Sequence, residues 1–308
     1  MKILLLSPNQ ISKYNWGHQL FRNEIGGQND VVFYGEGYPK KFNPSLSVNQ
    51  IIDKYYGESK PDFILTYGYR YTKPFPGLGE SKVPKVHISV DYFDKSGDFK
   101  GTMEGQNKFF REYKPDLVFG VVGRVVRNLK ENQISNKIFL LPFAVDTWIY
   151  KRNILERVND VLAAFTTRDD VYPNRTKVHR LLSNMDLMGV VTKRISHYSL
   201  IQAINKAKIS ITSNNIFSSL SMRYTEVLSS GGFLLADKPE DFTELGYVDG
   251  KHLVLYKGLD DLKEKIYYYL KHDKEREEIA NNGMKFVQTY HSCEIRAKQF
   301  RDIVKREL

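Results

Sequence analysis

The hydrophobic pattern of this chain switches repeatedly between two periods, and this alternation restricts the fold more than any other feature. Short β-rich runs alternate with longer segments in which apolar residues recur at helical spacing. Strands that alternate with helices form a mostly parallel sheet, because each helix carries the chain back to the start of the next strand. In the first half the predicted strands are residues 3–6, 31–34, 63–66, 86–90, 117–121 and 138–141, and the predicted helices are 18–25, 48–56, 106–113 and 125–132.

Two of these strands are introduced by the same phrase, KPDF at Lys60–Phe63 and KPDL at Lys114–Leu117. In each phrase a Pro ends the preceding helix, and an Asp stands where a buried strand begins. The repeated phrase therefore marks two equivalent helix-to-strand connections.

The same alternation begins again in the second half. The predicted strands are residues 161–165, 186–190, 209–212, 233–236 and 253–256, and the predicted helices are 175–183, 198–206, 222–229, 259–272, 274–289 and 293–307. The stretch Asp146–Asp160 is charged and lacks a β pattern, so we expect it to connect two domains. We predict an α/β protein with two Rossmann-like, doubly wound domains, residues 1–150 and 151–290, and a final helical segment, residues 291–308. Ligands of such sheets bind beyond the carboxyl ends of the strands, so both domains are expected to face a cleft.

Composition limits the class of protein and its partners. A hydrophobic fraction of 41% and a charged fraction of 27% are typical of a soluble globular protein. No apolar run approaches the roughly 20 residues of a membrane span, the N-terminus is too short in apolar residues for a signal peptide, and Cys293 is the only cysteine. These features predict a cytoplasmic protein. The net charge of +10 favours anionic partners such as nucleotides, anionic surfaces or nucleic acid, although dispersed charges also suit an ordinary solvated surface.

Several common site motifs are absent from the sequence. Neither the glycine-rich dinucleotide fingerprint nor the phosphate-binding P-loop motif occurs. No Asp-x-Asp stands in a loop after a predicted strand, and the seven His residues lack ligand spacing, so we expect neither a metal nor a cofactor. The acidic pairs Asp169–Asp170 and Asp260–Asp261 are interpreted as helix N-terminal caps.

A cluster of cations follows the first strand of the second half. Arg168, Arg175 and Lys177 surround the predicted start of a helix. Cations beside free helix N–H groups suit a diphosphate. Solvated surface charges are the alternative interpretation of these three residues.

The stretch Arg223–Asp237 combines a helix, a Gly-Gly turn and an apolar strand. The helix is expected to start near Ser221, and Arg223 and Glu226 lie three residues apart on one face of it. A carboxylate in this position can accept hydrogen bonds from both hydroxyls of a ribose, and the Arg can reach a phosphate. We include Ser221 and Tyr224 among the candidate substrate-binding residues. The alternative is an ordinary Arg/Glu pair on an amphipathic helix.

The order of the motifs resembles a known family. The pattern R-x-x-E-x-L-x-x-G-G-F-L-L-x-D, followed by residues 261–287, is similar to the C-terminal domain of family-1 glycosyltransferases, and most of all to their spore-maturation branch. The resemblance continues upstream through LLPFAVD (140–146), VYPNR (171–175) and INKAKISIT (204–212). It covers residues 140–299 well and the N-terminal half only in its strand–helix layout.

The resemblance implies a GT-B fold whose last helix crosses back to the first domain, and a nucleotide-sugar donor held mainly by the second domain. It further implies that Glu226 holds the donor ribose and that Arg168, with Arg175 or Lys177, faces the diphosphate. Relatives usually transfer with retention of configuration and without a bound metal. Many carry a second Glu eight positions before the ribose-binding one; here that position is Ser218, which puts an acidic partner at the sugar in doubt. The expected reaction moves a sugar from a UDP-sugar, or else a GDP-sugar, to a hydroxyl of a glycan, lipid-linked or other acceptor.

Candidate acceptor-side residues lie in the first half. His87 and Asp91 follow or end a buried strand, and either can orient an acceptor hydroxyl as a general base. Buried, hydrogen-bonded core residues are the alternative interpretation. Gly17 can admit an acceptor to a helix N-terminus, and His18 is a weaker candidate base; a flexible loop is the alternative there.

Two other functions are compatible with these features. The positive charge and the 20 Tyr residues also suit a glycosyltransferase that modifies bases of DNA, with a cleft that tracks phosphates and stacks on bases. The departure at Ser218 suits a glycosyltransferase-like protein that binds a glycan or nucleotide without turnover.

Overall fold

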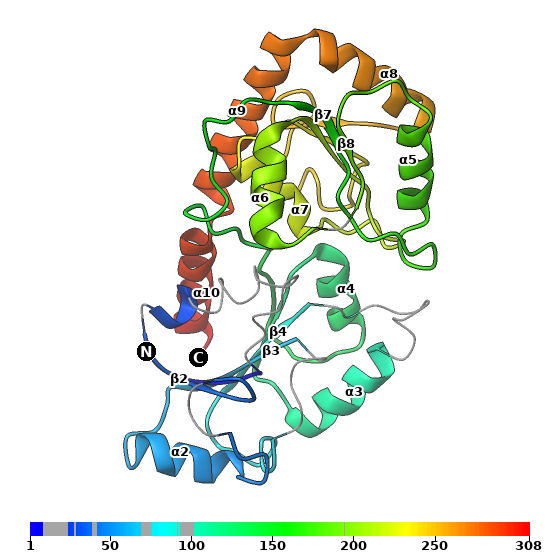
Figure 1. The fold of residues 1–308 in the computed structure, drawn as a ribbon. Helices are drawn as coiled ribbons and strands as arrows, with labels where there is room; N and C mark the ends of the chain where they lie inside the picture. Colours follow the sequence, from blue (N-terminus) through cyan, green and yellow to red (C-terminus); the bar gives the residue numbers. More distant parts are fainter. Residues whose placement is uncertain are drawn as a thin grey trace. The chain divides into compact units, whose positions relative to one another are not determined.

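The computed structural model describes residues 1–8, 24–27, 29–38, 42–68, 75–90, 92, 102–193 and 195–308. The chain divides into two compact units (Figure 1). Unit 1 consists of Met1–Pro142 and Arg296–Leu308, and unit 2 consists of Phe143–Ile295.

Unit 1 contains a six-stranded parallel sheet in the order β2-β1-β3-β4-β5-β6. Its strands are β1 (Lys2–Leu6), β2 (Asp30–Tyr34), β3 (Phe63–Tyr67), β4 (Lys85–Ser89), β5 (Leu117–Gly120) and β6 (Ile138–Leu140). Its helices include α2 (Val48–Tyr56), α3 (Thr102–Tyr113) and α4 (Gly123–Glu131). All six predicted strands are confirmed, and α3 begins four residues before the predicted helix.

Local sequence explains where these elements begin. Ser47 and Gln50 form a reciprocal capping box at the start of α2, and the apolar residues Val48, Ile51 and Ile52 face the core. In the repeated KPD phrase, the Asp62 carboxylate accepts the N–H of Lys2 at 2.8 Å, and the Asp116 carboxylate accepts the N–H of Lys85 at 2.8 Å. Each of these Asp residues thus satisfies the first N–H of the neighbouring strand.

The last helix, α10 (Cys293–Glu307), returns to unit 1. The ring of Phe300 is fully buried and lies 6.1 Å from that of Phe63 in β3 and 5.1 Å from that of Phe119 in β5. The side chain of Gln299 donates to the carbonyl of Leu140. The expected return of the final helix to the first domain is confirmed, and Figure 1 shows this helix in red.

Unit 2 contains a five-stranded parallel sheet in the order β11-β10-β9-β7-β8. Its strands are β7 (Asn159–Leu162), β8 (Val190–Val191), β9 (Ala207–Thr212), β10 (Leu234–Ala236) and β11 (Val254–Leu255). Its helices are α5 (Pro173–Ser183), α6 (His197–Lys206), α7 (Met222–Ser229), α8 (Gly258–Lys271) and α9 (Asp273–Tyr290). Leu234 and Ala236 pack with α6 and α7, whereas Leu235 packs with α5 and α8, so helices cover both faces of the sheet as predicted.

One predicted strand is largely wrong. Residues 186–190 were expected to be extended, but β8 begins only at Val190. Gly189 adopts a φ of +65°, and the N–H of Met188 donates to the Asp160 carboxylate at 2.7 Å. The left-handed glycine turns the chain just before the sheet, so the strand begins after it.

No helix among the described residues is both long and apolar enough to cross a membrane.

Candidate functional site

The strand order of unit 2 places a topological switch between β7 and β9. The chain leaves β7 toward β8 on one side and returns through β9 on the other. In open parallel sheets this point opens a crevice at the carboxyl ends of the strands, where ligands bind. The loops that follow the two strands, residues 163–172 and 213–221, therefore carry the candidate site of this unit.

Arg175 joins these two loops. It lies in the first turn of α5, which Pro173 begins, and only 7% of the residue is exposed. Its Nε donates to the carbonyl of Ser213 at 3.0 Å, its Nη1 donates to the carbonyl of Thr166 at 3.3 Å, and its guanidinium lies 3.6 Å from the centre of the Tyr172 ring. Burial lowers the pKa of Arg175 to about 10, which leaves the guanidinium charged at neutral pH. Arg175 thus fixes a positive charge at the switch point and holds the loops together.

The other two predicted cations are more exposed. Arg168 is partly exposed and pairs with Asp170 at 2.6 Å. Lys177 is exposed on α5. Arg168 lies in the loop before α5, and Arg175 and Lys177 lie on α5 itself. Of these three predicted cations, only Arg175 is buried.

The two acidic pairs differ from each other. α5 begins after Tyr172 without a side-chain cap, so the predicted capping role of Asp169–Asp170 is wrong; Asp170 is engaged by Arg168 instead. Asp261 accepts the N–H of Lys257 at 2.7 Å at the start of α8 and pairs with Lys265. This second pair lies in the first turn of α8, but the N-cap residue is Lys257 and has no side-chain cap bond, so the predicted capping role is wrong here too.

The stretch Arg223–Asp237 folds as its sequence indicates. α7 begins after Ser221 and ends in a Schellman turn, in which the N–H of Gly231 bonds to Leu228 and that of Gly232 bonds to Val227. Gly231 has a φ of +67°, a conformation that favours glycine. The turn leads directly into β10. The helix N-terminus consequently lies at the end of the loop that follows β9.

Glu226 is held from two sides inside this helix. Only 5% of the residue is exposed. Its Oε2 lies 3.1 Å from Nη1 of Arg223, and its Oε1 accepts the hydroxyl of Tyr150 at 3.0 Å. The Nη2 of Arg223 also donates to the carbonyl of Ala164 at 3.3 Å, which ties the pair to the end of β7. An ionised carboxylate has about four acceptor positions. Tyr150 fills one, and Arg223 Nη1 forms an ion pair with Oε2 without a hydrogen bond, so at least two positions remain at Glu226.

Tyr224 does not lie in the site that we predicted for it. It is fully buried, and its hydroxyl donates to the backbone carbonyl of Asp237 at 2.6 Å. The Asp237 carboxylate accepts the Ser213 hydroxyl at 2.9 Å and the N–H of Asn214 at 2.7 Å, and burial raises its pKa. Because its side chain points into the core, Tyr224 joins the ends of β9 and β10 and has no exposed surface for a substrate.

Unpartnered hydroxyls surround the start of α7. The hydroxyl oxygens of Ser219 and Ser221 are buried and have no hydrogen-bond partner among the described residues. Ser218 has a φ of +50°, and its carbonyl accepts the N–H of Glu240 at 2.9 Å. Buried hydroxyls are normally satisfied, so these two groups, next to the free N–H groups of the helix, form a set of donors suited to an anionic ligand.

In unit 1, His87 lies in the core. It is fully buried in the middle of β4, its Nδ1 lies 2.7 Å from the Thr66 hydroxyl, and the rings of Phe109, Phe110 and Tyr113 surround it. Burial lowers the pKa of His87 to about 3. The acceptor-side role considered for His87 is therefore contradicted, because no surface of its ring reaches a substrate. The candidates Gly17, His18 and Asp91 lie outside the described residues.

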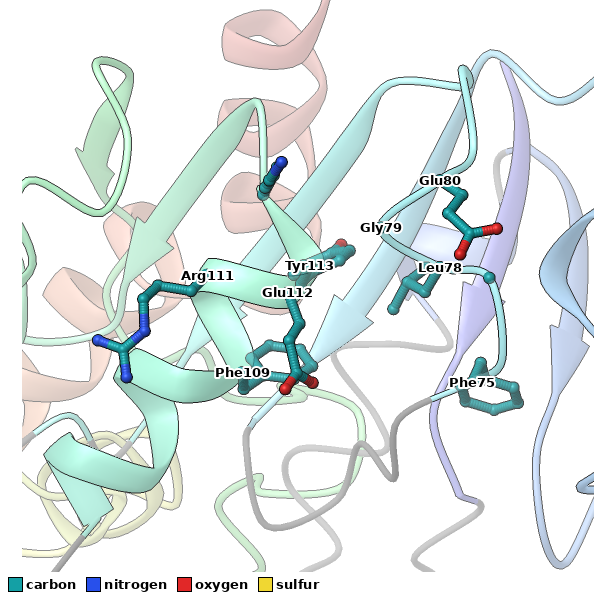
Figure 2. Close-up of a pocket in the computed structure, with 10 residues that line it drawn as sticks. Phe75, Leu78, Gly79, Glu80, Phe109, Arg111, Glu112 and Tyr113 are labelled. Atoms are coloured by element: carbon teal, nitrogen blue, oxygen red, sulfur yellow. The ribbon is translucent and has the colours of Figure 1, made fainter.

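Unit 1 also contains a pocket that the sequence did not indicate. It has a volume of about 420 Å³ and lies between residues 75–80 and the end of α3 (Figure 2). Residues 75–84 connect to β4 through turns, and Gly79 packs so closely that a Cβ there would lie 1.9 Å from the carbonyl oxygen of Glu112. Figure 2 shows Phe109 and Glu112 on the α3 side opposite Leu78, with Arg111 pointing away. Its lining includes two carboxylates, three aromatic rings and the two cations Arg111 and Lys114.

Among the described residues, no group of three or more His, Cys, Asp or Glu side chains is arranged to hold a metal ion.

Comparisons with known proteins agree with this geometry. Residues 168–302 match the family model described as glycosyl transferase-like. The structure is similar to that of HepE from Anabaena in complex with UDP and glucose, with a TM-score of 0.70 and 12% identity over 99% of this chain and 100% of that chain. The chain has the two-unit α/β fold of these solved glycosyltransferase structures, and its residues 168–302 match a glycosyl transferase-like family model.

Two more solved structures share the architecture. Sucrose-phosphate synthase from Thermosynechococcus elongatus gives a TM-score of 0.67 at 10% identity, covering 99% of this chain and 98% of that chain. An alpha-glucosyltransferase in complex with UDP-glucose and DNA containing an abasic site gives 0.62 at 12% identity, with the same coverage. No curated protein sequence matches this chain. The family match contains Arg168, Arg175, Lys177, Arg223 and Glu226, whereas Tyr150 precedes it.

Sequence reasoning missed Tyr150. Its contact with Glu226 joins residues 76 positions apart, and no local spacing relates the two. The only available signal was its place just after the LLPFAVD motif, in a segment that we interpreted as a connection.

Proposed function

We propose that this chain is a glycosyltransferase that binds a UDP-sugar in unit 2 and transfers the sugar to a hydroxyl of its acceptor. The observation that carries the proposal is Glu226, a buried carboxylate at the switch point with two acceptor positions unused. Two adjacent ribose hydroxyls would fill those positions. HepE, whose structures contain UDP and UDP-glucose, supports the choice of uridine among nucleotides.

The diphosphate of the donor would lie at the start of α7. The helix N–H groups, the hydroxyls of Ser219 and Ser221, and the guanidinium of Arg223 provide neutral and charged donors there. Negative charge grows on the diphosphate as the sugar leaves, and fixed donors aimed at that charge lower the barrier. Arg168 and Lys177 lie on either side of the enclosed Arg175 in the sequence and are more exposed than it is, and we assign them to the same charge. The family resemblance leads us to propose transfer with retention of configuration and without a metal or cofactor.

A thermal-unfolding screen tests the donor. We expect UDP and UDP-glucose to raise the unfolding temperature, whereas ADP and GDP leave it unchanged. A ligand at about 100 times its dissociation constant stabilises the folded state by roughly 2.7 kcal/mol. Release of UDP from UDP-glucose in the presence of candidate acceptors would then report transfer. A shift with GDP or ADP alone would contradict the assignment to UDP.

DNA is a second candidate acceptor. The net charge of +10 and the similarity to two glucosyltransferases described with DNA or as DNA-modifying favour it. If unit 1 or unit 2 contacts phosphates, the logarithm of the DNA affinity should fall linearly with the logarithm of salt concentration. We expect this decline in an electrophoretic or fluorescence titration with duplex DNA between 50 and 200 mM salt, ~10-fold or more for three phosphate contacts. Absence of DNA binding at low salt would leave a glycan or lipid-linked hydroxyl as the acceptor.

A further inference from the structure

The backbone of Tyr150 is held in place by contacts other than the one between its hydroxyl and Glu226. The backbone N–H of Tyr150 donates to the carbonyl of Asp146 at 2.9 Å, and the backbone carbonyl of Tyr150 accepts the hydroxyl of Ser229. The Asp146 carboxylate in turn accepts the N–H groups of Trp148 and Ile149. The residue is 1% exposed and packs in the core formed with α6 and α7. A side chain anchored in this way has little freedom to move when a ligand arrives.

The contact between Tyr150 and Glu226 has a defined direction. A carboxylate only accepts hydrogen bonds, so the hydroxyl of Tyr150 must donate to Oε1. Burial, together with the nearby charge of Glu226, raises the pKa of Tyr150, which keeps the proton on the hydroxyl. The hydroxyl of Tyr150 therefore remains the donor at neutral pH.

Tyr150 and Arg223 divide the two oxygens of Glu226 between them. Tyr150 engages Oε1, and Arg223 lies against Oε2. With one partner on each oxygen, rotation of the carboxylate about its terminal bond would break both contacts. The plane of the carboxylate is consequently set before binding, and with it the direction of the two unused acceptor positions.

We propose that Tyr150 is a positioning residue, which aims the Glu226 carboxylate at the ribose hydroxyls of the donor nucleotide and thereby selects ribonucleotides over 2′-deoxyribonucleotides. The proposal rests on the proposed function of Glu226. Tyr150 itself need not touch the nucleotide. A carboxylate whose orientation is already fixed binds a ligand with both ribose hydroxyls more tightly. A ligand that lacks one hydroxyl leaves a carboxylate oxygen without a hydrogen bond and therefore binds more weakly.

The test is isothermal calorimetry of UDP and 2′-deoxy-UDP with the wild-type chain and Tyr150→Phe, which removes only the hydroxyl. We expect UDP to bind about tenfold more weakly to the variant, and the ratio of the two dissociation constants to fall by a similar factor. General loosening of the protein would weaken both ligands equally and leave the ratio unchanged. Tyr269→Phe is the matched control, because that hydroxyl also faces a carboxylate, Glu275, at 3.4 Å in the same unit.

A double-mutant cycle separates the possible failures. If Tyr150 acts through Glu226, Tyr150→Phe should change UDP affinity little once Glu226→Ala is present. An unchanged ratio in Tyr150→Phe, or an equal loss of affinity in the Glu226→Ala background, would overturn this proposal while the ribose role of Glu226 stands. UDP binding that is indifferent to Glu226→Ala would overturn the role of Glu226 and this proposal with it. Unfolding midpoints of all variants establish that each one is folded.

Discussion

His87 in unit 1 and Glu226 in unit 2 are both ionisable side chains buried in a parallel α/β unit, yet their surroundings differ. His87 lies in the middle of β4 among aromatic rings, with one hydrogen bond to Thr66 and a neutral ring. Glu226 lies on the helix that follows β9, with a cation and a hydroxyl on its two oxygens. Burial by itself therefore does not mark a site. Spare hydrogen-bonding capacity does not mark one either, because the Nε2 of His87 is buried without a partner among the described residues. What distinguishes Glu226 is a charged partner together with a position beyond the strand ends.

The largest expected loss of unfolding free energy is that of Arg175, which holds together the two loops of the unit 2 site. Arg175→Leu removes the donors to the carbonyls of Ser213 and Thr166 and leaves both oxygens without their partner. At about 1–3 kcal/mol for each buried group, unit 2 should lose about 3 kcal/mol of unfolding free energy, measured by urea denaturation. A loss below about 0.5 kcal/mol, the size of an ordinary surface substitution, would show that the buried cation of unit 2 contributes no more than an exposed one.

The second prediction concerns the pH dependence that His87 gives to unit 1. Burial lowers its pKa to about 3, whereas the unfolded chain titrates near pH 6.5. Between these values the unfolded state binds a proton that the folded state does not, so acidification below pH 6.5 should destabilise the wild-type chain. The loss should approach about 1.4 kcal/mol per pH unit, and His87→Leu should lack this contribution.

The check is urea unfolding of both proteins between pH 7.5 and 5. Above pH 6.5 the difference in unfolding free energy between the two proteins should stay constant. Below pH 6.5 the unfolding free energy of the wild-type chain should fall relative to that of His87→Leu. Parallel curves over the whole range would mean that His87 is charged or solvated in the folded state, and the contrast with Glu226 would disappear.

The smallest expected change in stability is that of Lys177, the exposed cation, and it contrasts with the large change expected for the enclosed Arg175. Lys177→Ala should leave stability nearly unchanged, because the side chain is exposed on α5. If Lys177 meets the charge that develops on the diphosphate, turnover of UDP-glucose should fall about tenfold while UDP affinity changes much less. Lys274→Ala, at another exposed lysine of unit 2, provides the control for loss of net charge. An equal loss of turnover in both variants would remove Lys177 from the site.

The sequence predicted those parts of the fold that depend on local pattern. Period and turn residues located α7 and its Gly-Gly turn, and helical spacing placed Arg223 and Glu226 on one face. Gly189 shifted a strand because a single left-handed residue outweighed an apolar run.

The site depended on contacts that local pattern does not encode. The partner of Glu226 is Tyr150, and only tertiary folding brings the two together. Tyr224 was predicted to bind substrate but is buried, and for His87 the alternative of a buried core residue is the one that the structure shows. A polar side chain in an apolar segment can face either the core or a ligand, and local pattern does not decide between them. Arg175 was predicted as a cation at the start of the helix, but its backbone carbonyl partners follow from loop conformations that spacing does not specify.

Calorimetric titration of UDP-glucose into the wild-type chain and into Glu226→Ala tests the central claim most directly, with Glu244→Ala as an exposed control in the same unit. Two hydrogen bonds to a charged group predict that Glu226→Ala weakens binding by about 100-fold or more, while the control binds as the wild type does. Equal affinity of the folded Glu226→Ala variant and the wild-type chain would contradict the assignment of this carboxylate to the donor ribose.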